Sequence, residues 1–268
     1  MSAEQDILQR KIPMSLFAVV AIVTIVNLIG PSTAKIVDCI LYVIIPGIPM
    51  VLSILYVKRI GFAGMHGKAW LAFSIAVTSS FIAEQMWMMY DKILHVDPWP
   101  SEADFFYFSF YVFFAIFSVF YIKPFAKSVN AKKITMSALV SLAIFMPTAI
   151  SLASFEKSQW DARGFDIIMG VAYPIADSII MIPTMIAIML FFEGKVGFLW
   201  TAIFVGILCF VVADMLFLME EIDSAYDIGH PIDIGYFWAY VLFAFGVYHN
   251  MKYFEKPKTR FSNLNDLR

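Results

Sequence analysis

Long apolar runs constrain this chain more than any other feature. A helix needs about 20 mostly apolar residues to cross the hydrocarbon core of a bilayer. The sequence holds eight runs of roughly this length, at 14–30, 36–57, 69–90, 104–123, 134–154, 166–192, 196–219 and 232–252. They are continuously apolar, whereas the strands of a membrane barrel alternate. With 61% hydrophobic and only 15% charged residues, the sequence predicts an all-α integral membrane protein with eight transmembrane helices.

The lysines and arginines predict the orientation of these helices. With the N-terminus placed in the cytoplasm, 15 of the 19 lysines and arginines fall on the cytoplasmic side. The four outside are Lys35, Lys92, Lys157 and Arg163. The positive-inside rule therefore predicts a multi-pass protein of the cell membrane with both termini in the cytoplasm. The acidic segment around 220–227 then faces outward.

One motif, D-x-x-Y-F-x-x-Y, occurs twice, at 104–111 and at 233–240. Its spacing places the shared residues on one face of a helix. The likeness extends upstream, because Trp70 precedes Glu84 by 14 residues and Trp200 precedes Asp214 by 14 residues. The sequence therefore predicts two four-helix repeats that run in the same direction through the membrane. The expected division is a cytoplasmic N-terminal tail at 1–13, a first repeat at 14–123, a basic linker at 124–133, a second repeat at 134–252 and a basic cytoplasmic tail at 253–268.

Five carboxylates fall in the outer half of the predicted bundle or at its outer boundary: Glu84, Asp104, Asp177, Asp214 and Asp233. No lysine or arginine lies in the apolar centre of a predicted helix. Ionisable residues inside a membrane are costly and mark functional sites by default. These acids are therefore expected either to be partly protonated or to bind a cation or a ligand rich in hydrogen-bond donors.

The candidate site combines these acids with the tyrosines of the motif. Its predicted ligand-binding residues are Glu84, Asp104, Tyr107, Tyr111, Asp177, Asp214, Asp233, Tyr236 and Tyr240. A structural interpretation stays open for each acid. Asp104 and Asp233 begin predicted helices, where an aspartate caps the helix or complements its positive end. Glu84 and Asp214 are placed to accept hydrogen bonds from the motif tyrosines. The outer tryptophans, among them Trp87 and Trp99, form either an interfacial belt or the walls of an outward cavity.

Enzymatic, metal and cofactor chemistry find little support in the sequence. It contains no H-E-x-x-H or G-x-S-x-G motif and no paired cysteines. No cofactor, bound metal, nucleic-acid partner or catalytic residue is therefore expected.

The run Asp97-Pro98-Trp99-Pro100-Ser101-x-Ala103-Asp104-x-x-Tyr107 resembles a stretch of a known kind of membrane module. That module lies ahead of histidine kinases and diguanylate cyclases in prokaryotic signalling proteins. Tyr173-Pro174-x-x-Asp177 is similar to the same pattern. The resemblance covers about a third of the chain and implies an input or binding role. The 268 residues hold no kinase or cyclase pattern, so on this resemblance the chain is expected to be a free-standing relative of the membrane module.

The leading hypothesis is a non-enzymatic membrane module, sensory or regulatory, that binds a ligand or cation at an outward acidic and aromatic cavity. One alternative is a small transporter or proton or cation pathway that uses the same acids. Another is an accessory subunit of a larger membrane complex, in which the acids only join helices. The expected partners are the lipid bilayer and a membrane protein, either a different chain or a second copy of this one.

Overall fold

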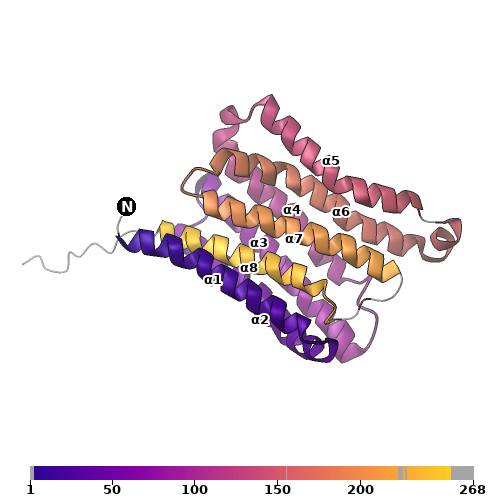
Figure 1. The fold of residues 1–268 in the computed structure, drawn as a ribbon. Helices are drawn as coiled ribbons and strands as arrows, with labels where there is room; N and C mark the ends of the chain where they lie inside the picture. The colour runs from indigo at the N-terminus through magenta and orange to yellow at the C-terminus, as the bar shows by residue number, and fades with distance from the viewer. Residues whose placement is uncertain (1–2, 155, 223–225, 227, 255–268) are drawn as a thin grey trace, which may run out of the picture.

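The computed structural model describes residues 3–154, 156–222, 226 and 228–254, and its regular secondary structure there is entirely helical (Figure 1). Eight α-helices follow one another in this part of the chain: α1 (Ala3–Leu28), α2 (Pro31–Ile60), α3 (Gly64–Met88), α4 (Ala103–Ile122), α5 (Ala131–Ser154), α6 (Lys157–Phe191), α7 (Gly197–Ile222) and α8 (Asp233–Tyr253). A π-helical segment (Met89–Leu94) follows α3, and a 3-10 helix (Lys123–Ser128) follows α4. The all-α prediction is confirmed.

Five of the described helices are long and apolar enough to cross a membrane. The spans are Thr33–Ile60, Ala103–Ser128, Ala131–Ala153, Arg163–Phe191 and Gly197–Glu220. These spans indicate a membrane protein. Crossing by α1, α3 and α8 as well stays a prediction.

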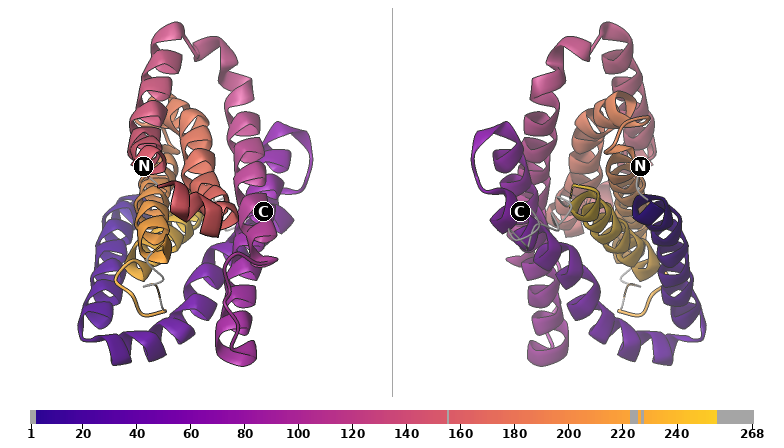
Figure 2. Two further views of the ribbon diagram at one scale, coloured as in Figure 1. Left: turned by 90° about the vertical axis from the view of Figure 1, so that its right-hand side faces the viewer. Right: turned by 90° about the vertical axis from the view of Figure 1, so that its left-hand side faces the viewer.

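The polar side chains of α3 and α8 have a physical explanation in the position of these two helices. Helix α3 packs against α2 and α4, while α8 packs against α1, α2 and α7 (Figure 2). Their polar side chains therefore face neighbouring helices. On α3 these buried polar residues include Ser80 and Glu84, and on α8 they include Asp233 and Asn250. A polar residue that faces the interior of a bundle avoids the cost of contact with lipid.

Aromatic rings form the core between the first and second halves of the chain. Phe117 of α4 lies 5.7 Å from Trp70 of α3 and 5.4 Å from Trp200 of α7, measured between ring centroids. Both tryptophans are fully buried. Aromatic pairs are favourable over this range of distances. Trp70 lies about 21 Å along the helix from Glu84, so this packing fixes α3, α4 and α7 well away from the acids.

The outermost helices are held differently. Helix α1 lies against α2 and α8, whereas α5 packs chiefly on α6 at one edge of the bundle (Figures 1 and 2). Much of α5 is consequently exposed, including Leu139, Leu142 and Ile150. These apolar side chains suit contact with lipid.

The first residues of α1 and the last residues of α8 lie at the same end of the bundle (Figure 1). Helix α1 begins at Ala3, so most of the predicted tail at 1–13 is helical and continues into the first apolar run. The predicted tail at 253–268 lies outside the described residues beyond Phe254, as do Asp223 and Asp227 of the acidic loop.

Candidate functional site

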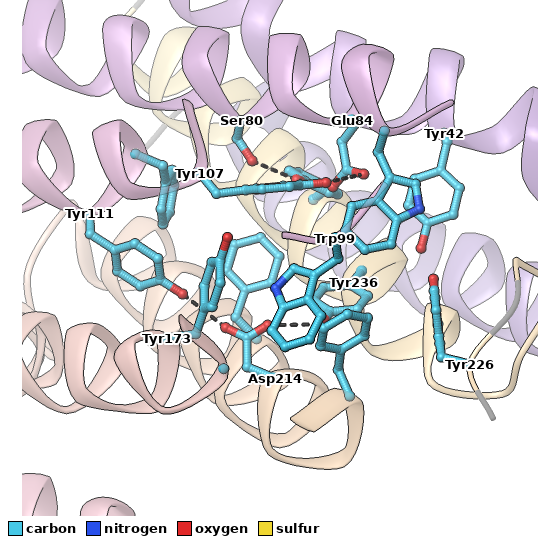
Figure 3. A pocket seen from close by; sticks show the side chains of 16 residues that line it. Tyr42, Ser80, Glu84, Trp99, Tyr107, Tyr111, Tyr173, Asp214, Tyr226 and Tyr236 are labelled. Atoms are coloured by element: carbon cyan, nitrogen blue, oxygen red, sulfur yellow. Dashed lines mark hydrogen bonds between the residues drawn. The ribbon is translucent and has the colours of Figure 1, made fainter. Parts of the chain in front are cut away.

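A cavity of about 70 Å³ lies at the end of the bundle where the segments holding Trp99 and Tyr226 meet the helices (Figure 3). Two carboxylates line it, Glu84 from α3 and Asp214 from α7. Apart from these acids, Ser80 and Gly170, the residues that line it are all aromatic. The two acids therefore lie on different helices but face a single aromatic-walled space.

Each of these two carboxylates accepts hydrogen bonds from two tyrosine hydroxyls. Glu84 accepts one from Tyr107 at 3.0 Å and one from Tyr240 at 2.7 Å. Asp214 accepts one from Tyr111 and one from Tyr236, both at 2.8 Å. In each case the two hydroxyls reach different oxygens of the carboxylate. Hydrogen bonds to a charged acceptor are stronger than neutral ones and stabilise its charged form.

The hydrogen bonds cross between the two halves of the chain. Tyr107 of α4 binds the acid of the adjacent α3, and Tyr236 of α8 binds the acid of the adjacent α7. One helical turn further along, Tyr111 of α4 binds Asp214, and Tyr240 of α8 binds Glu84. Each copy of the motif thus donates one hydrogen bond to the acid of its own half of the chain and one to the acid of the other half.

Asp104 and Asp233 lie behind the cavity wall, where both are buried. Asp104 accepts the backbone N–H of Ser101 at 2.7 Å and the hydroxyl of Tyr173. Asp233 accepts the backbone N–H of Gly229 at 2.7 Å. It also accepts the hydroxyls of Tyr42 and Tyr226, both at 2.8 Å. Each aspartate therefore fixes the turn ahead of its helix, and holds tyrosines that do line the cavity.

Tyr226 lies between α7 and α8, and burial raises the pKa of its hydroxyl well above the ordinary value. A tyrosine that keeps its proton remains a hydrogen-bond donor. The bond from Tyr226 to Asp233 is therefore retained under ordinary conditions, and it ties this segment to the start of α8.

Asp177 of α6 is fully buried, and its carboxyl interacts with that of Asp214. Within the described part of the chain, neither oxygen of Asp177 has a donor in hydrogen-bonding geometry. Two ionised carboxylates have no proton to donate to each other. A hydrogen bond between Asp177 and Asp214 therefore requires one proton held between the two carboxyls. Asp38 stands in the same relation to Asp233. It too is fully buried, and among the described residues no donor reaches either of its oxygens in hydrogen-bonding geometry, although the side chain of Asn27 interacts with it.

The predicted site residues thus fall into two groups. Glu84, Tyr107, Tyr111, Asp214, Tyr236 and Tyr240 line the cavity. Asp104, Asp177 and Asp233 do not line it and lie behind its wall.

Sequence reasoning missed several residues of the wall. Tyr42 and Tyr173 line the cavity from α2 and α6, and Tyr226 lines it from the segment between α7 and α8. Trp87 and Trp99, which the sequence offered as possible cavity walls, line it as well. Tyr173 stands in the Tyr-Pro-x-x-Asp pattern that the sequence already offered. Tyr42 had no such signal, because its role depends on how α2 packs against α8.

The described residues contain no group of three or more histidines, cysteines, aspartates or glutamates placed to hold a metal ion. What the cavity offers is charge, hydrogen-bond acceptors and ring faces. This arrangement can bind a molecule.

Comparisons with known protein families, with curated proteins and with solved structures found no match. The resemblance to the input modules of prokaryotic signalling proteins therefore stays a hypothesis.

Proposed function

We propose that this chain is a non-enzymatic membrane module that binds a small ligand in the cavity between Glu84 and Asp214. In this proposal all eight helices cross the cell membrane as two duplicated halves, with both termini in the cytoplasm. The cavity then faces outward, and a ligand reaches it from the extracytoplasmic side. Its role is sensory or regulatory, and its output passes to a membrane protein partner.

One observation carries the proposal. Two acids from α3 and α7, which the sequence marks as equivalent, face one cavity with aromatic walls. If the acids only joined helices, their hydrogen bonds would be sufficient. The side chains could then pack closely, and no cavity would be needed between them. A concave, mostly apolar cavity with a few convergent polar groups is the usual form of a small-molecule site.

The first test is thermal unfolding of the full chain in nanodiscs with methylammonium, glycerol or acetate as probes. A ligand that binds the native state raises its stability in a saturable way. The matched variant is Glu84→Gln/Asp214→Asn, which removes two charges and retains shape. A saturable shift with any of these probes in the wild type that is absent from the double variant supports a binding site.

A second candidate is an accessory subunit in which the acids only join helices. The observation that favours it is that Glu84 and Asp214 each already have two tyrosine donors. If no probe stabilises the wild type and the double variant is less stable, this candidate replaces the binding proposal. Co-purification would then be used to identify the partner chain.

A further inference from the structure

We infer that the ligand is a small organic cation, an ammonium that carries methyl or short alkyl groups, bound between Glu84 and Asp214. This inference rests on the proposed function, because it names the ligand class of the same cavity.

The first argument concerns hydrogen-bond donors. The four motif tyrosines that line the cavity already donate to its two carboxylates. Tyr42, Tyr173 and Tyr226 donate to the aspartates behind the wall. The cavity therefore presents mainly carboxylate lone pairs and ring faces. A neutral polyol needs donors as well as acceptors, whereas an ammonium group brings only donors or a bare positive charge.

The second argument concerns charge. The donors that reach the carboxylates of Glu84 and Asp214 in the described part of the chain are neutral hydroxyls. Asp177, fully buried, places a third acid beside Asp214. Opposite charge in a weakly screened environment attracts strongly, so this end of the cavity favours a cation.

The third argument concerns the walls and selects an organic cation over a metal ion. Calcium and magnesium take six or more oxygen ligands, and the cavity is walled by rings instead. Trp87 and Trp99 lie 5.7 and 5.8 Å from Phe217 in edge-to-face contacts, which help to close one side of the cavity. The negative faces of such rings attract alkylammonium groups.

The fourth argument concerns size. The cavity measures about 70 Å³, and one water needs roughly 10–15 Å³ on this scale. A ligand of about five non-hydrogen atoms, the size of tetramethylammonium, therefore fits. Trp99 also lines the cavity, with 4% of its side chain exposed, and its Nε1–H has no acceptor among the described residues. A hydroxyl on the ligand, as in choline, would supply that acceptor.

The test is isothermal titration of the full chain in nanodiscs with tetramethylammonium, choline and the neutral analogue of choline in which carbon replaces nitrogen. The neutral analogue has the shape of choline without its charge. Two variants accompany the wild type. Glu84→Gln/Asp214→Asn removes both charges from the cavity, and Glu102→Gln removes the charge of an exposed carboxylate outside the cavity.

The inference predicts saturable binding of both cations and at least about tenfold weaker binding of the neutral analogue. It also predicts that the double variant loses at least about a hundredfold in affinity for the cations while Glu102→Gln binds like the wild type. If the neutral analogue binds as tightly as choline and the double variant weakens that binding, the inferred ligand class is wrong, while the proposed binding function still holds. Failure of these probes together with methylammonium, glycerol and acetate would overturn both.

Discussion

Glu84 and Asp214 receive the same hydrogen bonds in different surroundings. Each accepts one tyrosine hydroxyl from an adjacent helix and one from the other half of the chain. Asp214 has a second carboxyl beside it, that of Asp177. On the side of Glu84, the hydroxyl of Ser80 instead lies 2.5 Å from that of Tyr240. The comparison teaches that the motif sets the direct contacts of both acids, whereas residues outside it give the two acids different neighbours, a second carboxyl beside Asp214 and a serine hydroxyl on the side of Glu84.

The largest effect is expected from the tyrosines that join the halves. Tyr240→Phe removes a donor from buried Glu84 and also leaves Ser80 without this partner, so it should destabilise the protein by about 2–3 kcal/mol. Tyr111→Phe removes one donor from Asp214 and should cost about 2 kcal/mol. Denaturant unfolding in detergent micelles measures both. If both variants are as stable as the wild type, the carboxylates do not depend on these donors.

Asp177→Asn sharpens the comparison in the opposite direction. The asparagine replaces a fully buried carboxyl that lies beside a second carboxyl, and its amide can donate to Asp214 without a shared proton. We expect a gain in stability of about 1 kcal/mol. A contrasting change is Gln85→Glu on α3, which removes a donor to the backbone carbonyl of Tyr42 and should lower stability. A loss of stability in Asp177→Asn would show that Asp177 is held by a favourable contact.

Trp99→Phe tests the cavity wall with a smaller expected effect. The indole N–H has no acceptor in the described part of the chain, so only packing is lost on substitution. A cost of about 1 kcal/mol in unfolding free energy is expected. In the titrations, this variant should reduce the preference for choline over tetramethylammonium. An unchanged preference would mean that the N–H does not contact the ligand hydroxyl.

The smallest effect is expected at an exposed pair outside the cavity. Tyr90 donates to Glu102 at 2.7 Å, and this hydrogen bond lowers the pKa of the Glu102 carboxyl. Tyr90→Phe should return that pKa upward toward its ordinary value, as followed by NMR titration. A carboxyl whose pKa is lower in the folded than in the unfolded state stabilises the fold at neutral pH, and this stabilisation is lost as the pH falls through the lowered pKa. Any difference in stability between Tyr90→Phe and the wild type should therefore disappear on acidification. An unchanged pKa would contradict the hydrogen bond as its cause.

Much of this arrangement could be predicted from sequence because it depends on local periodicity. The spacing of Tyr107 and Tyr111 from Asp104 places them on one helix face, and the second copy repeats it. Apolar runs likewise predict helices without reference to their neighbours. The positions of the acids on α3 and α7 then follow from the same logic.

Other parts of the site depend on contacts between distant segments. Tyr42 reaches Asp233 across 191 residues of sequence, and no periodicity reports that contact. Whether an acid lines a cavity or lies behind its wall depends on helix packing, which the local sequence around Asp104 and Asp233 does not report. The sequence predicted a tail at 1–13, whereas α1 begins at Ala3. The reason is that polar residues can continue a helix beyond its apolar run.

The most direct test of the central claim is the stoichiometry of tetramethylammonium binding in Glu84→Gln and Asp214→Asn, measured separately in nanodiscs. If the two acids share one ligand, the wild type binds one cation per chain. Each single variant then weakens that site and leaves the stoichiometry unchanged. Two cations per chain, with one lost in each variant, would mean that the acids form separate sites and that the account of a shared cavity is wrong.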